Sequence, residues 1–249
     1  MAEEGGSTGG GVVVENPSGS GPWVLVCEHA GKWIPPEFGD LGLAPELLTS
    51  HIAWDPGALA VARAVSRILD APLVAQLTSR LIYDCNRPPV SDGAMPEVSE
   101  VHRVPGNAGL SPAQRDGRTR SVYFPFRDTV AASIDRQCAV AGDIAVVTVH
   151  SFTPVYKGLR RDVEVGILHD TDTRLADAML AAAATDLVVR RNEPYGPADG
   201  VTHTLRTHAL PRGLANVMIE VRNDLIADAG SQDAMAQRLA RWLLAARGG

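Results

Sequence analysis

Short runs of hydrophobic residues alternate along the chain with longer segments in which hydrophobic residues recur every three or four positions. Apolar runs of this length, bounded by turn residues, predict buried β-strands. The predicted strands cover residues 12–14, 23–27, 72–77, 145–149, 163–168, 187–190 and 216–221. The first of them is short and is expected at an edge of the sheet.

The segments with helical periodicity predict helices over residues 44–51, 57–70, 124–141, 173–184, 204–209 and 231–246. Asp55-Pro56-Gly57 is a helix-start signal, because aspartate caps a helix and proline suits its first turn. Ser231 is the predicted cap of the last helix. Strands that alternate with helices predict one α/β domain with a largely parallel or mixed sheet.

Two segments fit neither pattern. Residues 1–11 are rich in glycine and serine and predict a disordered tail, which leaves residues 12–249 as the folded domain. Residues 90–118 are rich in Gly, Pro, Ser and Asp and predict a long loop. Long loops inside compact domains are often functional.

Composition excludes several classes of function. The net charge of the 249 residues is −6 and they contain no run of basic residues, so nucleic acid is not expected as a partner. No apolar stretch is long enough to cross a membrane, and no signal peptide is evident. The three cysteines are widely spaced, which favours a reducing cytoplasm over a disulfide scaffold. Nothing in the sequence indicates the oligomeric state.

Polar clusters follow four of the apolar runs: Glu28-His29, Asp84 to Arg87, His150-Ser151 and Glu220 to Arg222. In open α/β sheets the binding cleft lies at the carboxyl ends of the strands, so these clusters are expected to converge. Two histidines and a carboxylate suit zinc with one position left for water. A nearby free glutamate would serve as general base, and arginines would bind a substrate carboxylate. The pattern therefore predicts a metal hydrolase.

Each of these residues also has a purely structural interpretation. Asp55 alone is explained equally well as a helix cap, and Glu220 as a solvated residue at a strand end. Asn86 and Arg87 suit an ordinary turn. Ser151 is not a nucleophile paired with the preceding histidine, because adjacent residues of a strand point to opposite faces.

Six ordered segments of the chain together resemble the N-formylglutamate amidohydrolase family. They cover nearly the whole chain after the tail, which makes the resemblance far more specific than any single motif. They are Cys27 to Gly31 with Ile34-Pro35, Ala53 to Ala58, Ser79 to Pro88, Thr148 to Phe152, Asn192 to Tyr195, and Met218 to Leu225.

The resemblance implies a fold similar to that of zinc carboxypeptidases and phosphorylase/hydrolase-like proteins, a mixed, twisted sheet between helix layers. It implies zinc-dependent hydrolysis of a small N-formyl or related N-acyl amino acid. By position, one zinc ion per chain would be held by His29, Asp55 and His150. Glu220 resembles the general base, and Arg80 is a candidate for stabilising the oxyanion.

The same resemblance implies which residues bind the substrate. Asn86 and Arg87 resemble a pair that binds the substrate carboxylate in carboxypeptidase-like proteins, and Arg222 and Tyr195 are expected to assist. Two further hypotheses remain open at this level. One is a carboxylate-binding protein without catalysis on the same fold, and the other is a carboxypeptidase-like peptidase.

The chain departs from the related sequences around its first histidine. The His-x-x-Glu zinc motif of carboxypeptidases is absent, so the carboxylate ligand must come from elsewhere, with Asp55 preferred over Glu28. Glu28 and Ala30 stand where members closest to formylglutamate hydrolases have proline and serine. This difference argues against a simple transfer of glutamate as the released amino acid.

Overall fold

Seven strands form one mixed sheet in the computed structural model, which describes residues 11–183 and 186–248. The strands lie side by side in the order β1-β3-β2-β6-β11-β9-β10. Their bounds are β1 Val12–Glu15, β2 Trp23–Cys27, β3 Leu73–Gln76, β6 Ala145–Phe152, β9 Val165–Leu168, β10 Val189–Arg191 and β11 Ala215–Arg222. Two small hairpins stand apart from it: β4 Val98–Ser99 with β5 His102–Arg103, and β7 Val155–Tyr156 with β8 Leu159–Arg160.

The centre of the sheet is parallel. β3, β2, β6 and β11 run the same way, whereas β1 pairs antiparallel with β3 and β9 pairs antiparallel with β11. The carboxyl ends of β2, β6 and β11 therefore meet at one edge, and the start of β9 lies at that edge too. The predicted single α/β domain with a mixed sheet is confirmed.

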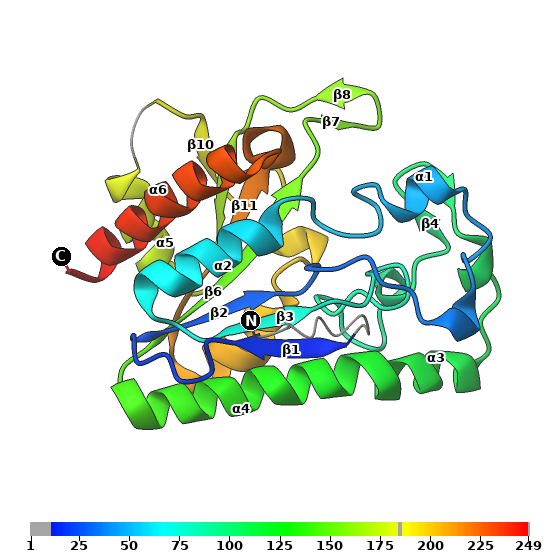
Figure 1. The fold of residues 1–249 in the computed structure, drawn as a ribbon, viewed down its shortest axis with the longest axis horizontal. Coiled ribbons are helices and arrows are strands. Elements are labelled where there is room, and N and C mark those ends of the chain that lie inside the picture. Colours follow the sequence, from blue (N-terminus) through cyan, green and yellow to red (C-terminus); the bar gives the residue numbers. More distant parts are fainter. Residues whose placement is uncertain (1–10, 184–185, 249) are drawn as a thin grey trace, which may run out of the picture.

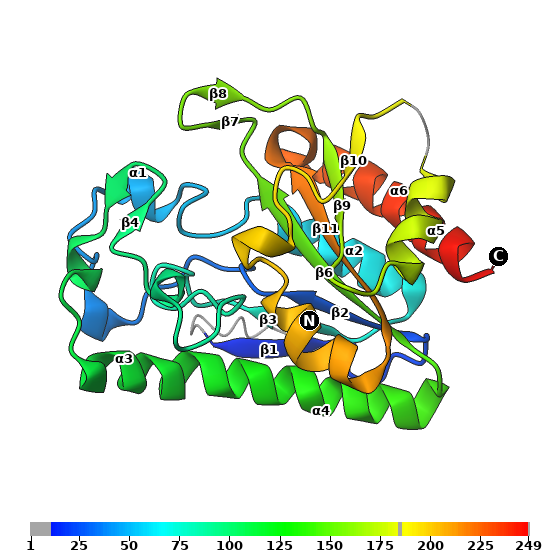
Figure 2. The same cartoon turned by 180° about the vertical axis from the view of Figure 1, so that it is seen from behind.

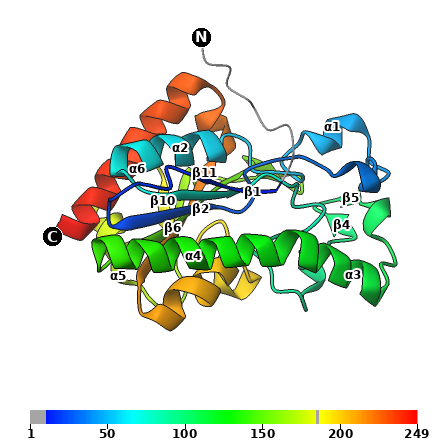
Figure 3. The same ribbon diagram turned by 60° about the horizontal axis from the view of Figure 1, so that its bottom comes forward.

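Helices cover both faces of the sheet (Figures 1 and 2). Viewed from below, α2 and α6 lie over one face and α4 over the other (Figure 3). The α-helices are α1 Pro45–Leu48, α2 Ala58–Leu69, α3 Pro112–Arg118, α4 Phe124–Ala141, α5 Arg174–Ala182 and α6 Ala229–Gly248. Two π-helical turns, η4 Thr119–Tyr123 and η6 Leu205–Ala209, and short 3₁₀ turns complete the described elements. None of the helices in residues 11–183 and 186–248 has the length and apolar character needed to span a membrane.

Alternating strand residues enter two different hydrophobic cores. Val147 and Val149 pack with α2, α5 and α6, whereas Val146 packs with the α4 side. Because side chains alternate along a strand, His150 lies on the α4 face and Ser151 on the other. The Ser151 hydroxyl accordingly donates to the Pro56 carbonyl, 2.8 Å away, in the turn before α2.

Several predicted boundaries needed correction. β6 continues to Phe152, so His150 lies within the strand instead of after it. The predicted helix over residues 44–51 is reduced to the four residues of α1. The loop over residues 90–118 contains the β4–β5 hairpin and α3. The predicted tail lies outside the described residues except for Gly11.

Both predicted helix caps were wrong. Asp228 caps α6: its Oδ1 accepts from the Ser231 amide at 3.0 Å, and Ser231 lies inside the first turn. Helix α2 begins after Gly57, whose φ of 82° is left-handed and whose neighbour Ile226 leaves no room for a Cβ. Asp55 does not cap the helix, so its side chain is free to point elsewhere.

Candidate active site

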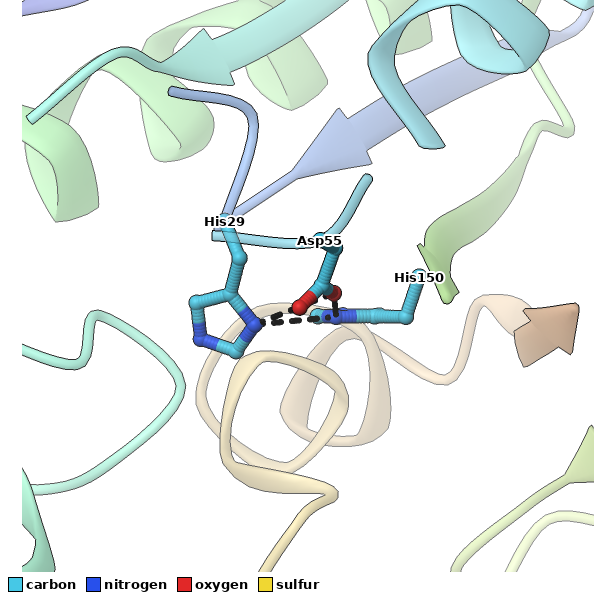
Figure 4. Close-up of side chains that lie close together, drawn as sticks. All are labelled: His29, Asp55 and His150. Atoms are coloured by element: carbon cyan, nitrogen blue, oxygen red, sulfur yellow. Dashed lines mark hydrogen bonds and ion pairs between the residues drawn. The ribbon is translucent and has the colours of Figure 1, made fainter. Parts of the chain in front are cut away.

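Three side chains from separate parts of the chain converge on one point (Figure 4). His29 follows β2, Asp55 precedes α2 and His150 belongs to β6. The Nδ1 atoms of the two histidines are 3.2 Å apart, and Asp55 Oδ2 lies 3.2 Å from His29 Nδ1 and 2.8 Å from His150 Nδ1. All three residues are at most 3% exposed. This is the set of ligands expected from the sequence, brought together by the fold.

The geometry of these three atoms fits a zinc ion. Tetrahedral zinc with bonds of about 2.0–2.1 Å separates its ligand atoms by about 3.3 Å, close to the observed spacing. Two nitrogens and a carboxylate oxygen are a common ligand set of catalytic zinc, which keeps a further position open. His29, Asp55 and His150 are therefore a possible metal site.

The outer nitrogen of each histidine faces a second carboxylate. His29 Nε2 lies 2.7 Å from Asp84 Oδ1, and His150 Nε2 lies 3.0 Å from Glu28 Oε2. The His29–Asp84 contact is a hydrogen bond, whereas His150 and Glu28 are within ion-pair distance without hydrogen-bond geometry. A carboxylate hydrogen-bonded to Nε2 would keep the proton there and leave the lone pair of Nδ1 for a metal ion. Glu28, the less favoured ligand candidate, is thus placed behind His150.

The charges around this cluster favour a divalent cation. Burial lowers the pKa of His150, but Glu28 and Asp55 raise it well above its usual value. Burial and Arg80 lower the pKa of His29, whereas Asp84 and Asp55 outweigh them and raise it. With both histidines neutral, as metal binding requires, the carboxylates of Glu28, Asp55 and Asp84 against the Arg80 guanidinium leave two formal negative charges, which a divalent metal ion would neutralise.

Arg80 holds two of the carboxylates in place. Its Nη1 donates to Asp55 Oδ1 at 3.3 Å and its Nη2 to Asp84 Oδ2 at 2.6 Å. Burial lowers the pKa of Arg80, but the charges of Asp84 and Asp55 outweigh burial and raise that pKa above its usual value. The guanidinium is therefore permanently charged. Arg80 also lines the cavity beside the metal site, where the sequence predicted an oxyanion-stabilising residue.

Glu220 is the neighbour of His150 on the next strand. The two residues pair in the parallel register of β11 with β6, so their side chains lie on the same face of the sheet. Burial is the main cause that raises the pKa of Glu220 from 4.5 to about 7. Within the described residues, its Oε2 atom is buried without a hydrogen-bond partner. A carboxyl with these properties suits a general base at neutral pH.

A cavity of about 490 Å³ opens above these residues, at the edge where β2, β6 and β11 end. Arg87 and Tyr195, both predicted to bind substrate, line it. Burial and the charge of Glu220 raise the pKa of the Tyr195 phenol to about 12, so it stays a hydrogen-bond donor. Arg87 donates to the Gly200 carbonyl through Nη1.

Asn86 also borders the cavity, but its amide group is already engaged. Nδ2 donates to the Val201 carbonyl, and Oδ1 accepts from the Thr204 amide at 3.1 Å. The side chain fixes the segment 201–204 against the site. One Nδ2 hydrogen remains, so the expected contact of this amide with substrate stays a prediction.

Arg222 does not line the cavity. Its Nε donates to Asp224 at 2.8 Å, Nη2 to Glu164 at 3.4 Å, and Nη1 to the Arg161 carbonyl at 3.3 Å. The residue lies on the same face of β11 as Glu220 but two positions further along. These contacts anchor the chain before β9, and the expected contact of Arg222 with substrate stays a prediction.

Several polar residues of the cavity had no assigned role in the sequence analysis. Asp84 lies in a buried irregular turn. Its position two residues before Asn86, in the same polar cluster, was the sequence feature that could have identified it as a site residue. His51 Nε2 contacts Glu100 at 2.8 Å, and Glu100 Oε1 accepts from the Lys157 amide at 2.9 Å, which joins the loop over residues 90–118 to the β7–β8 hairpin above the cavity. Arg161 and Tyr156, from the same hairpin region, also line the cavity.

Known proteins resemble this chain in sequence and fold. A gene product from Agrobacterium tumefaciens of known crystal structure is 57% identical, with a TM-score of 0.94 and 96% of each chain covered. The N-formylglutamate amidohydrolase from Ralstonia eutropha JMP134 is 19% identical, with a TM-score of 0.73 over 96% of this chain and 98% of that one, a likeness of fold. No curated protein matches the sequence significantly.

The family model of N-formylglutamate amidohydrolase matches residues 21–227. This range contains every residue of the possible metal site, Glu220 and the arginines of the cavity. Membership supports hydrolysis of an amide. The chain belongs to the N-formylglutamate amidohydrolase family.

Proposed function

We propose that this protein is a zinc-dependent amidohydrolase that acts on N-formyl or closely related N-acyl amino acids resembling N-formylglutamate. The reaction adds water across the amide and yields formate, or the corresponding acid, and the free amino acid. The convergence of His29 Nδ1, His150 Nδ1 and Asp55 Oδ2, with a carboxylate behind each histidine, is the observation that supports the metal most strongly.

A zinc ion held by these three residues would polarise the acyl carbonyl and lower the pKa of a bound water to about 7. Glu220 accepts the proton of the attacking water and returns it to the leaving amine. Burial raises the pKa of Glu220 to about 7 in the metal-free protein. The charge of a bound zinc ion would lower this pKa and favour the ionised form that accepts a proton. The buried Oε2 atom of Glu220 makes no hydrogen bond to another described group, so it is free to accept one from the attacking water.

Two arginines have separate tasks in this proposal. Arg80 is fixed by Asp55 and Asp84 beside the metal site, where its positive charge stabilises the negative charge that develops on the acyl oxygen. Arg87 binds the α-carboxylate of the substrate through the donors that Gly200 does not occupy. A carboxylate fixed in this way orients the amide toward Glu220.

The shape of the cavity supports a small substrate. Ser99 and Glu100, from the loop over residues 90–118, line it together with Tyr156 of the β7–β8 hairpin. The contact between Glu100 and the Lys157 amide closes these two segments over the site. We expect these segments to limit the cavity of about 490 Å³ to a single N-acyl amino acid and to exclude a longer peptide.

A substrate screen tests the proposal. Purified protein is incubated with N-formyl amino acids, N-acetyl amino acids and an N-blocked dipeptide, and released formate, acetate and free amino acid are measured. We expect formate release to dominate and the dipeptide to remain intact. Dipeptide cleavage would favour the peptidase hypothesis, and ligand binding without hydrolysis would favour the binding protein.

A further inference from the structure

Arg161 extends into the cavity from the segment between β8 and β9. Its guanidinium carbon lies 4.5 Å from the centre of the Tyr156 ring, 4.8 Å from that of Tyr195 and 5.5 Å from that of Phe152. All three rings also line the cavity. Aromatic rings at these distances attract a guanidinium and restrict its rotation without neutralising its charge.

The charge of Arg161 has no acidic partner among the described residues. Its hydrogen bond goes to the Thr153 carbonyl, at 3.4 Å. Arg80, by contrast, is paired with two carboxylates of the metal site. Arg161 therefore offers unused N–H donors and an uncompensated positive charge to whatever enters the cavity.

The backbone that carries Arg161 is held firmly. Buried Arg222 donates through Nη1 to the carbonyls of Arg161, Asp162 and Val163 at 3.3, 3.5 and 3.5 Å. The contact of Arg222 Nη2 with Glu164, 3.4 Å away, fixes the next residue. An arginine that is anchored at its backbone and packed among aromatic rings loses little further entropy when it binds an anion.

We propose that Arg161 binds a second carboxylate, on the substrate side chain, and so selects N-acyl amino acids with acidic side chains. The inference rests on the proposed function, in which Arg87 binds the α-carboxylate. Arg87 and Arg161 reach the cavity from different loops, after β3 and before β9, and neither is paired with a carboxylate of the described residues. Two such arginines match a dicarboxylate, and the planar fork of each allows bidentate contacts.

The test compares two substrates of nearly equal shape, N-formyl-L-glutamate and N-formyl-L-glutamine. The wild type should prefer the glutamate compound. Arg161→Gln should lower kcat/KM for that substrate roughly 10- to 100-fold, mainly by raising KM, because a charge-assisted contact made equally in ground and transition states is lost. Its kcat/KM for the glutamine compound should change little. Arg161→Lys should lie in between.

Arg160→Gln is the matched control. Arg160 is the exposed neighbour on the same hairpin and does not line the cavity, so its loss removes the same charge without touching the substrate. The control should keep wild-type selectivity. Thermal unfolding of both variants shows whether the hairpin region remains folded.

Two results would overturn the inference while leaving the proposed function intact. They are equal activity of the wild type on both substrates, and an unchanged preference for glutamate in Arg161→Gln. If the wild type hydrolyses neither substrate, the proposed function fails instead. Binding of glutarate, measured by calorimetry, then decides the role of Arg161. A Kd raised roughly tenfold or more in Arg161→Gln supports the role, and an equal Kd refutes it.

Discussion

Glu220 allows a prediction in which catalysis and stability change in opposite directions. Burial raises its pKa from 4.5 to about 7, and its Oε2 atom has no hydrogen-bond partner among the described residues. Glu220→Gln keeps the shape of the side chain but cannot accept a proton. We expect kcat to fall by roughly 10²–10⁴-fold, the usual contribution of a general base, with zinc binding retained.

The effect on stability follows from the same pKa, measured in metal-free protein. Raising a carboxyl pKa from 4.5 to about 7 makes its ionisation in the folded state about 3 kcal/mol less favourable than in the unfolded chain. Below about pH 4.5 the carboxyl is protonated in both states. Between about pH 4.5 and 7 only the unfolded chain releases the proton, so the wild type loses stability as the pH rises. Above pH 7 the loss is complete.

The glutamine side chain does not titrate, so Glu220→Gln lacks this loss. The free energy of unfolding of the variant, relative to wild type, should therefore rise by about 3 kcal/mol between pH 4.5 and 8. For a protein of this size that corresponds to a relative gain in Tm of roughly 6–12 °C. Urea unfolding at both pH values measures the difference. A pH-independent difference would refute the raised pKa, and near-wild-type kcat would refute the general base. Loss of zinc from Glu220→Gln would instead make Glu220 a ligand.

Three further predictions concern single contacts. Asp84→Asn should weaken zinc binding about 10- to 100-fold in a chelator competition, because the amide supports His29 less well, and unchanged affinity would contradict that role. Arg87→Lys keeps the charge but loses the planar fork, so kcat/KM for an N-formyl amino acid should fall. The α-amide of that substrate should be hydrolysed poorly by both the wild type and the variant. An unchanged kcat/KM for the N-formyl amino acid would exclude the contact. Asp228→Ala removes the cap of α6 and should lower the midpoint of urea unfolding, whereas the control Asp233→Ala in the same helix should lower it less.

The sequence predicted the sheet well because its strands are buried apolar runs. All eight residues of β6 are buried, and the run ahead of His150 identified both the strand and its functional end. The pairing of His150 with Glu220 could not be predicted in the same way. It depends on the parallel register of β6 and β11, which places two residues 70 positions apart side by side.

Other features of the site could not be predicted from the sequence, because they depend on contacts distant in sequence or on very short elements. Asp55 carries a helix-cap signal, yet two histidines and Arg80 take its side chain instead. Arg222 shares a strand face with Glu220, but Glu164 and Asp224 draw its guanidinium away from the cavity. Arg161 follows a hairpin whose strands are two residues long, too short for any periodic signal.

Titration of metal-free protein with zinc, with formate release from N-formyl-L-glutamate as the readout, tests the central claim most directly. The three converging ligand atoms of His29, Asp55 and His150 predict that activity is absent without zinc, rises in proportion to added zinc and levels off at one equivalent per chain. Formate release at full rate without zinc, or none at any zinc concentration, would contradict the account.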